Sequence, residues 1–158
     1  MSASYIPPRM QGCVPYVIYE DVAKAIAFYK EALHATEQMR LEGPDGRIAH
    51  AQIVVSGTTI MMGSPMPGCA SKAPTKEISS PVSFYVYVAD VEQAFARAKR
   101  AGMSEIMPVK DMFWGDRTGA VADPFGYQWT LAQFVRRMSP DELKKGHNEM
   151  IKQMENAA

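Results

Sequence analysis

Two neighbouring charged residues late in the sequence have the types needed to hold a polar ligand. Asp116 and Arg117 directly follow Trp114 and a glycine. Arginine presents a planar fork that binds carboxylates or phosphates through paired hydrogen bonds. The same two residues also suit an ion pair, either with each other or with side chains of neighbouring strands. Two interpretations therefore stay open: a site for a polar head group, or a structural pair.

His50 is the main candidate for acid–base chemistry, because an imidazole titrates near neutral pH. No carboxylate that would orient the ring stands near it in the sequence. A histidine that hydrogen-bonds across a sheet fits the pattern equally, and the other two histidines, His34 and His147, suit structural or solvated positions. No nucleophile–base pair, phosphate-binding loop or paired-carboxylate spacing stands out, so the motifs alone assign no reaction.

The two tryptophans are candidates for the walls of an apolar pocket. Trp114 stands in a bend next to glycine, which favours a position facing a cavity. Trp129 alternates with Tyr127 and Leu131 at the period of a strand, which is more typical of a core residue. Both are retained as candidate ligand-binding residues.

Composition excludes several classes of partner. Hydrophobic residues make up 47% of the 158 residues, enough for a real core, and 17 basic residues balance 17 acidic ones. No global charge therefore favours nucleic acid. No apolar run approaches the roughly 20 residues that cross a bilayer, so no membrane partner is expected. Cys13 and Cys69 lack metal or disulfide spacing, which indicates a cytoplasmic protein.

The first half of the chain predicts a β-α-β-β-β unit over residues 12–63. A β-branched and aromatic run at 13–19 predicts a strand, and Asp21 then caps a helix that ends near Leu33. Three further strands follow. Their predicted ranges are 36–42, 47–55 and 58–63, with a turn at 43–46.

The second half repeats this order after a proline-rich linker at 64–81. The second unit, residues 82–135, begins with a strand at 82–88, and Asp90 caps a helix that Gly102 terminates. Strands are predicted at 104–113, 117–123 and 126–134.

The two halves match in one register without a gap. Gly57 and Gly126, each before a strand, are 69 residues apart (126 − 57 = 69), and the helices match at the same offset. The identical pairs are Asp21/Asp90, Val22/Val91, Ala25/Ala94, Ala27/Ala96, Lys30/Lys99 and Ala32/Ala101. Such a match indicates a duplicated unit whose half-covered sheet needs its twin to bury a face.

A separate helix is predicted at 139–155. Ser139 and Glu142 form a capping box, with Pro140 at the first helical position. The apolar stripe of this helix predicts docking on its own unit or on a second copy. Its members are Leu143, His147, Met150, Ile151 and Met154.

The sequence resembles the vicinal oxygen chelate superfamily of glyoxalases, bleomycin-resistance proteins and extradiol dioxygenases. The resemblance covers about residues 12–135 and rests on the tandem units, the Asp-Val helix starts and the Asp-Pro-Phe-Gly turn that begins at Asp123. Arg47-Ile-Ala-His-Ala-Gln and Asp111-Met-Phe-Trp-Gly-Asp-Arg117 resemble the PhnB-like branch. The resemblance implies an α+β fold of two tandem glyoxalase-like β-α-β-β-β modules that form a concave mixed sheet, plus the C-terminal helix.

The resemblance also locates the positions where metal-dependent members carry their ligands, usually His or Glu. These positions hold Val14, Met61, Ser83 and Thr130 here. None offers a carboxylate, imidazole or thiolate, the groups that zinc, nickel, iron or manganese require. The resemblance therefore implies a member without the usual metal, and no other cofactor is expected.

The leading hypothesis is a PhnB-like glyoxalase/bleomycin-resistance-type protein that binds a small, partly apolar molecule in the sheet cleft. Its candidate ligand-binding residues are Met61, Trp114, Asp116, Arg117 and Trp129, and relatives of this type imply a homodimer. Two alternatives stay open. One is a metal-dependent lyase, isomerase or dioxygenase of the same superfamily, and the other is a structural or regulatory dimer without a ligand.

Overall fold

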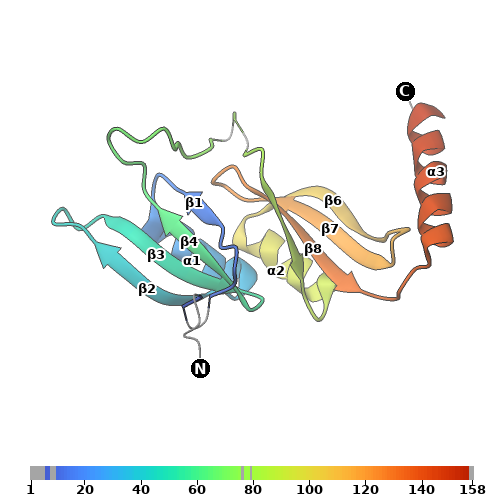
Figure 1. Cartoon of the computed structure of the whole chain (residues 1–158), viewed down its shortest axis with the longest axis horizontal. Coiled ribbons are helices and arrows are strands. Elements are labelled where there is room, and N and C mark those ends of the chain that lie inside the picture. Colours follow the sequence, from blue (N-terminus) through green and yellow to red (C-terminus); the bar gives the residue numbers. More distant parts are fainter. Residues whose placement is uncertain (1–5, 8–9, 76, 79, 157–158) are drawn as a thin grey trace.

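The structure is built from two four-stranded mixed sheets, each covered on one side by a helix (Figure 1). It is a computed structural model that describes residues 6–7, 10–75, 77–78 and 80–156. Within these residues three helices are present, the third at the C-terminal end. The predicted α+β fold of two tandem glyoxalase-like units is confirmed.

The first sheet has the strand order β1-β4-β3-β2, with β1 parallel to β4 and the other pairs antiparallel. Its elements are β1 (Tyr16–Ile18), α1 (Val22–Leu33), β2 (Thr36–Glu42), β3 (Ile48–Val55) and β4 (Thr58–Gly63). The predicted first strand, 13–19, is shortened to three residues. Pro15 precedes it and has no N–H to give to a ladder, although its carbonyl accepts a hydrogen bond from the Met61 N–H at 2.9 Å.

The second sheet repeats this arrangement as β5-β8-β7-β6. Its elements are β5 (Ser83–Tyr87), α2 (Val91–Ala101), β6 (Ser104–Asp111), β7 (Asp116–Ala122) and β8 (Gln128–Phe134). The duplication extends to the register, since Tyr16 pairs with Met61 and Tyr85 with Thr130. The offset in the sequence is therefore a real repeat of strand pairing.

The predicted helix caps are present in both units. The side chain of Asp21 accepts a hydrogen bond from the Lys24 N–H at 2.9 Å, and that of Asp90 accepts one from the Gln93 N–H at 3.0 Å. At the other end, α2 terminates at Gly102 in the left-handed conformation. These local signals fix where each helix begins relative to the strand before it.

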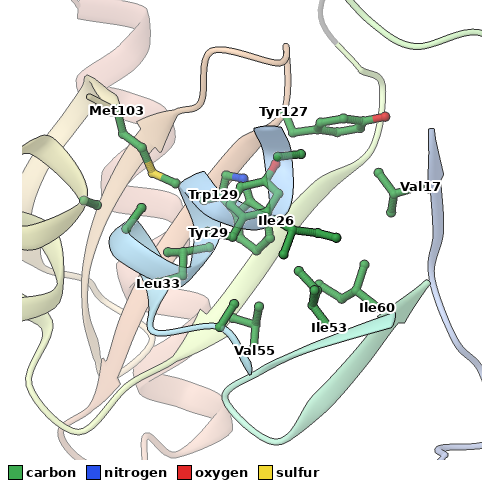
Figure 2. Close-up of a cluster of buried hydrophobic side chains, with 14 of the residues drawn as sticks. Val17, Ile26, Tyr29, Leu33, Ile53, Val55, Ile60, Met103, Tyr127 and Trp129 are labelled. Atoms are coloured by element: carbon green, nitrogen blue, oxygen red, sulfur yellow. The ribbon is translucent and has the colours of Figure 1, made fainter. Parts of the chain in front are cut away.

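The two units pack through their helix-covered faces and share one core (Figure 2). Strand alternation turns Trp129 and Leu131 of β8 to this side, where they are fully buried. Tyr29 of α1 meets the Trp129 ring at a centroid distance of 5.2 Å, and α1 also packs against α2. Each large apolar side chain buried here contributes about 1.5–3 kcal/mol.

A buried carboxylate joins the units at the centre of this core. Asp123 Oδ2 accepts hydrogen bonds from the Tyr29 hydroxyl at 2.5 Å and from Trp129 Nε1 at 2.8 Å. Asp123 Oδ1 accepts the backbone N–H groups of Phe125 and Tyr127, both at 2.9 Å. A helix of the first unit and the Asp-Pro-Phe-Gly turn of the second are thus held by one side chain.

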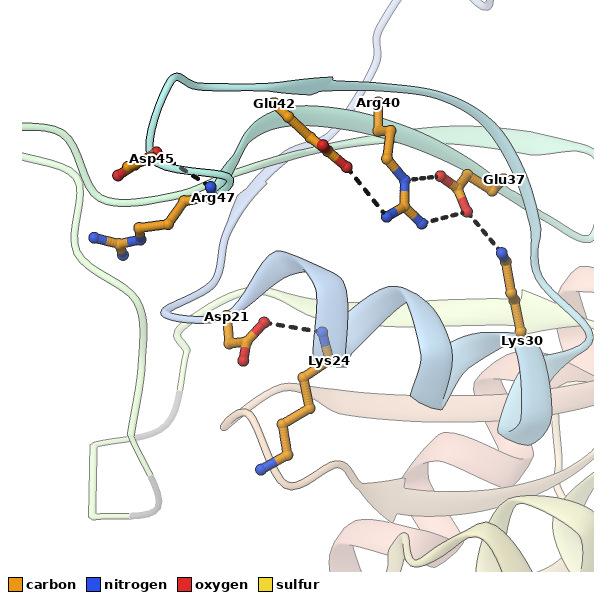
Figure 3. A network of polar contacts seen from close by, with 8 residues as sticks. All are labelled: Asp21, Lys24, Lys30, Glu37, Arg40, Glu42, Asp45 and Arg47. Atoms are coloured by element: carbon orange, nitrogen blue, oxygen red, sulfur yellow. Dashed lines mark hydrogen bonds and ion pairs between the residues drawn. The ribbon is translucent and has the colours of Figure 1, made fainter.

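An exposed ionic network ties α1 to its own sheet (Figure 3). Glu37 on β2 lies between Lys30 of α1, at 2.6 Å, and Arg40 of the same strand. The hydrogen bond from Arg40 is the largest cause, followed by that from Lys30, of a lowered pKa of about 2 for the Glu37 carboxyl. The network thus stays ionised at neutral pH and holds the helix end over the sheet.

The faces of the two sheets that turn away from the helices are called here the open faces. Five large apolar side chains on them are exposed in the single chain. They are Tyr16 and Leu41 on the first sheet, and Tyr85, Tyr87 and Phe134 on the second. The open faces therefore carry the apolar surface that the shared core does not use.

The C-terminal helix α3 (Pro140–Asn156) lies beyond the outer end of the second sheet (Figure 1). The predicted capping box forms, because Ser139 N donates to Glu142 Oε2 at 2.8 Å and Glu142 N donates to Ser139 Oγ at 3.3 Å. None of its described residues is buried, and Leu143, Ile151 and Met154 are exposed. In the part of the chain that is described, no helix is both long and apolar enough to cross a bilayer.

Candidate functional site

The open face of the second sheet gathers three aromatic side chains around one carboxylate. Asp116 at the start of β7 accepts hydrogen bonds on Oδ2 from the hydroxyls of Tyr85 and Tyr87, each at 2.8 Å. Trp114 Nε1 donates to the Tyr85 hydroxyl at 3.2 Å. We call these four residues the Asp116 cluster.

The tyrosines reach Asp116 by crossing the sheet. They lie on the edge strand β5, and β8 stands between that strand and β7. Ala132 of β8, opposite Tyr87 in the register, has a small side chain that is completely buried. The tyrosine rings thus extend over β8, and this covering leaves Asp116 only 4% exposed.

Gly115 sets the position of Asp116 and Trp114. Its φ of 95° lies in the left-handed region, and a Cβ there would stand 2.1 Å from the Arg136 carbonyl oxygen. The close approach lets the Gly115 carbonyl accept both the Val135 and Arg136 N–H groups at 3.0 Å. The bend before β7 is therefore fastened to the end of β8, and only glycine fits.

The cluster keeps its protons on the phenols. Burial is the main cause that raises the pKa of Tyr85 to about 12, and the hydrogen bond to Asp116 is the main cause that raises the pKa of Tyr87. Both hydroxyls therefore donate to the carboxylate at neutral pH. The cluster presents a negative charge covered by neutral aromatic rings.

Arg117, a candidate ligand-binding residue beside Asp116, does not belong to this cluster. Neighbouring residues of a strand point to opposite faces, so Arg117 lies on the helix side. It forms a bidentate pair with Asp111 there, with Nε–Oδ1 at 2.6 Å and Nη2–Oδ2 at 3.1 Å. Of the two interpretations of this residue, the structure supports an ion pair with a neighbouring strand.

Trp129 also lies away from the open face. It is completely buried, stacks on Phe84 at a centroid distance of 4.2 Å and donates to Asp123. It forms one wall of a cavity of about 210 Å³ between the turn after β3 and the edge strand β5. Val55, Ile60 and Phe84 line the same cavity, so Trp129 is a core residue that borders an apolar space.

His50 and Met61 lie on the open face of the first sheet. Nδ1 of His50 is 3.2 Å from the Tyr16 hydroxyl, and its Nε2 is 3.4 Å from Gln52 Nε2. The Tyr16 ring passes over Gly63, where a Cβ would stand 2.7 Å from the hydroxyl. Both imidazole nitrogens therefore face neutral groups, which agrees with a histidine that hydrogen-bonds across the sheet.

The positions implied as metal ligands do not fit a divalent ion. Met61 and Thr130 occupy equivalent places on β4 and β8, and Ser83 begins β5. With Val14 they supply a thioether, two hydroxyls and an alkyl group, which bind zinc or iron poorly. No group of three or more His, Cys, Asp or Glu side chains in the described residues is arranged to hold a metal.

Tyr85 and Tyr87 are the site residues that the sequence analysis missed. They occur at a spacing of two in the predicted strand 82–88, so they share one face. Tyr85 also repeats Tyr16 in the duplicated register. These two observations were a usable signal, but their common partner on β7 appears only in the folded chain.

The chain is similar to known proteins over most of its length. Residues 12–131 match the model described as "Glyoxalase/Bleomycin resistance protein/Dioxygenase superfamily". Uncharacterized protein Rv0887c of Mycobacterium tuberculosis is 41% identical over 133 residues, covering 82% of this chain and 78% of that protein.

Two solved structures have a similar fold. TioX from Micromonospora sp. ML1 has a TM-score of 0.62 at 24% identity, over 82% of this chain and 100% of that one. The PhnB protein from Bacillus cereus has a TM-score of 0.60 at 16% identity, over 78% of this chain and 99% of that one. At these identities the likeness concerns the fold alone.

Proposed function

Because the chain belongs to the glyoxalase/bleomycin resistance protein/dioxygenase superfamily, we propose that it binds a small, partly apolar molecule at the open sheet faces without a metal. The observation that carries this proposal is the Asp116 cluster, where three aromatic side chains and a buried carboxylate meet on an otherwise exposed surface. Aromatic walls with a few fixed polar groups are typical of small-molecule sites. The motif around Trp114 supports assignment to the PhnB-like branch.

The same proposal includes a dimer in the cytoplasm. The helices occupy the faces through which the two units pack, so a cleft over the open faces needs a second copy to close it. A two-fold pair would cover the exposed apolar side chains of both sheets. Cys13 and Cys69 are free and exposed, which suits a reducing compartment.

Binding can be tested with the two tryptophans as built-in reporters. Trp114 borders the proposed site, whereas Trp129 is buried in the core. Titration with naphthylmethanol, a neutral probe, is expected to shift the indole N–H signal of Trp114 in a proton–nitrogen correlation spectrum. The Trp129 signal should stay in place. A Trp114→Phe variant assigns the two signals, and an unmoved Trp114 signal at millimolar probe would refute the proposal.

Metal content gives a second test. Protein purified without chelator is expected to hold well under one equivalent of zinc, nickel, iron or manganese, because the four family positions lack ionisable ligands. Elemental analysis measures this directly. Stoichiometric metal that a chelator removes together with probe binding would instead favour the metal-dependent alternative.

Light scattering tests the dimer. The wild type is expected at twice the 17.5 kDa mass of the chain at micromolar concentration. A Phe134→Lys substitution adds charge to the open face of the second sheet, at a side chain that is 62% exposed in the single chain. This variant should shift toward the monomer while keeping its fold. A wild-type mass of one chain would contradict the proposal.

A further inference from the structure

The carboxylate of Asp116 is enclosed without a cation to balance it. It is only 4% exposed, and no ion pair to it exists among the described residues. The nearby guanidinium groups are engaged elsewhere, since Arg117 pairs with Asp111 and Arg136 pairs with Glu142 at 3.0 Å. A carboxylate withdrawn from water with hydroxyl partners alone retains an uncompensated charge.

The exposed tyrosine rings extend the negative potential of Asp116 to the protein surface. The hydroxyls of Tyr85 and Tyr87 point their protons at Asp116, and the Tyr85 oxygen accepts from Trp114 Nε1, so the Tyr87 oxygen keeps its lone pairs for another donor. The two ring centroids are 5.5 Å apart with an interplanar angle of 58°, and the residues are 47% and 54% exposed. Both the ring faces and the polarised oxygens carry negative potential.

A second polar group lies unpaired beside the carboxylate. Thr118 follows Asp116 by two residues on β7 and so shares its face. Its Oγ1 is buried and has no hydrogen-bond partner, and the residue is completely inaccessible. Buried hydroxyls are nearly always paired, so this oxygen is a second uncompensated polar group on the same face as Asp116.

We propose that the Asp116 cluster binds an organic cation, specifically a protonated amine attached to an apolar or aromatic body. This inference rests on the proposed function and names the chemical class of the ligand at the same site. A cation over tyrosine and tryptophan rings is attracted by their quadrupoles, and a carboxylate behind the rings strengthens the attraction. An anion would meet the like charge of Asp116 there.

A lysine on the neighbouring strand β6 does not neutralise the carboxylate. Lys110 on β6 stands opposite Thr118 in the register and is exposed, but it does not pair with Asp116. The remaining free surface of the cluster is aromatic. The ligand amine is therefore the group that meets the carboxylate charge, and its apolar body lies along the exposed rings.

A matched series of three probes tests the proposal on the full-length protein. Naphthylmethylammonium is a cation at neutral pH, naphthylmethanol is its neutral counterpart, and naphthoate is an anion with the same ring system. Titration calorimetry and the Trp114 indole signal both report binding. The cation is expected to bind about tenfold more tightly than the alcohol, and naphthoate more weakly than either.

Substitutions then test whether the charge of Asp116, and not the shape of the site, causes the preference for the cation. Asp116→Asn keeps the size of the side chain and should remove about the whole tenfold preference for the cation over the alcohol. Asp111→Asn is the matched control, because Asp111 pairs with Arg117 on the opposite face. It should change neither affinity. Tyr87→Leu removes an exposed ring without touching the core and should also weaken the cation selectively.

Each outcome decides a separate question. Equal affinity for ammonium and alcohol in the wild type, or an undiminished preference in folded Asp116→Asn and Tyr87→Leu proteins, would overturn the cation inference and leave the proposed function standing. If none of the three probes moves the Trp114 signal, both fail. If Asp116→Asn does not fold, the Tyr87→Leu protein and the wild-type probe series still decide.

Discussion

An Asp123→Ala variant is expected to lose about 3–5 kcal/mol of folding free energy. The lost carboxylate leaves the Tyr29 hydroxyl, Trp129 Nε1 and the N–H groups of Phe125 and Tyr127 without their acceptor inside the core. Unpaired buried donors cost about 1–3 kcal/mol each. Urea unfolding followed by tryptophan fluorescence measures the change.

An Asp111→Ala variant is the matched control for this loss. Its carboxylate pairs with Arg117 at the surface, where solvent screens the ion pair, so the stability should change little. A melting temperature of Asp123→Ala within about 2 °C of the wild type would show that the buried carboxylate does not join the units.

The pH dependence of the folding stability of the wild type follows from the burial of Asp123. Burial is the main cause that raises the pKa of Asp123 in the folded protein, against the hydrogen bonds that lower it. A folded-state pKa above the unfolded value means that the proton binds the folded chain more tightly. The contribution of this group to stability is thus complete below its unfolded pKa and declines as the pH rises through the folded pKa. In Asp123→Ala, the folding stability should no longer show this decline with rising pH.

A fragment of residues 1–70 is expected to be unfolded or self-associated. The first unit alone would expose Tyr29 and the helix-side face of its sheet, which the second unit covers with Trp129 and Phe125. The lost burial costs roughly 25 cal/mol per Å². Two further contacts also disappear, the Tyr127 hydroxyl to the Ile18 carbonyl at 2.7 Å and Arg97 Nε to the Ala32 carbonyl at 3.2 Å.

Amide spectra of the fragment distinguish the outcomes. Poor dispersion or broad signals are expected for 1–70 alone, and addition of 71–158 should restore native dispersion by re-forming the shared core. A monomeric fragment with sharp, dispersed signals would show that each unit folds independently, contrary to the packing described.

Local signals in the sequence predicted the architecture because they act over a few residues. Asp21 and Asp90 are followed by helical apolar spacing, and the capping box at Ser139 fixes the start of α3. The register of the duplication then predicts that the second unit repeats the elements of the first in the same order along the chain. The ends of the strands were less certain, as β6 stops at Asp111 where the bend through Gly115 begins.

The site was harder to predict because it depends on which strands become neighbours. The interpretation that joined Asp116 to Arg117 followed from their adjacency in the sequence. Adjacent residues of a strand point to opposite faces of the sheet, so the two side chains are separated. The partners of Asp116 come from β5, where Tyr85 and Tyr87 stand 31 and 29 residues earlier in the sequence. Asp123 was recognised as part of a turn motif, but its role as the acceptor for Tyr29 needs the packing of α1 against the second unit.

The helices between the two sheets separate the residues that maintain the fold from those of the open faces, where we propose that a ligand binds. Exchanges at Tyr16, Leu41 or Tyr87 replace side chains already about half in solvent, so they forfeit little burial. Mutations that alter recognition can thus accumulate with little loss of foldability. In this sense the duplicated scaffold lets side chains change on both open faces while the interior, held by Asp123 and Trp129, keeps the fold.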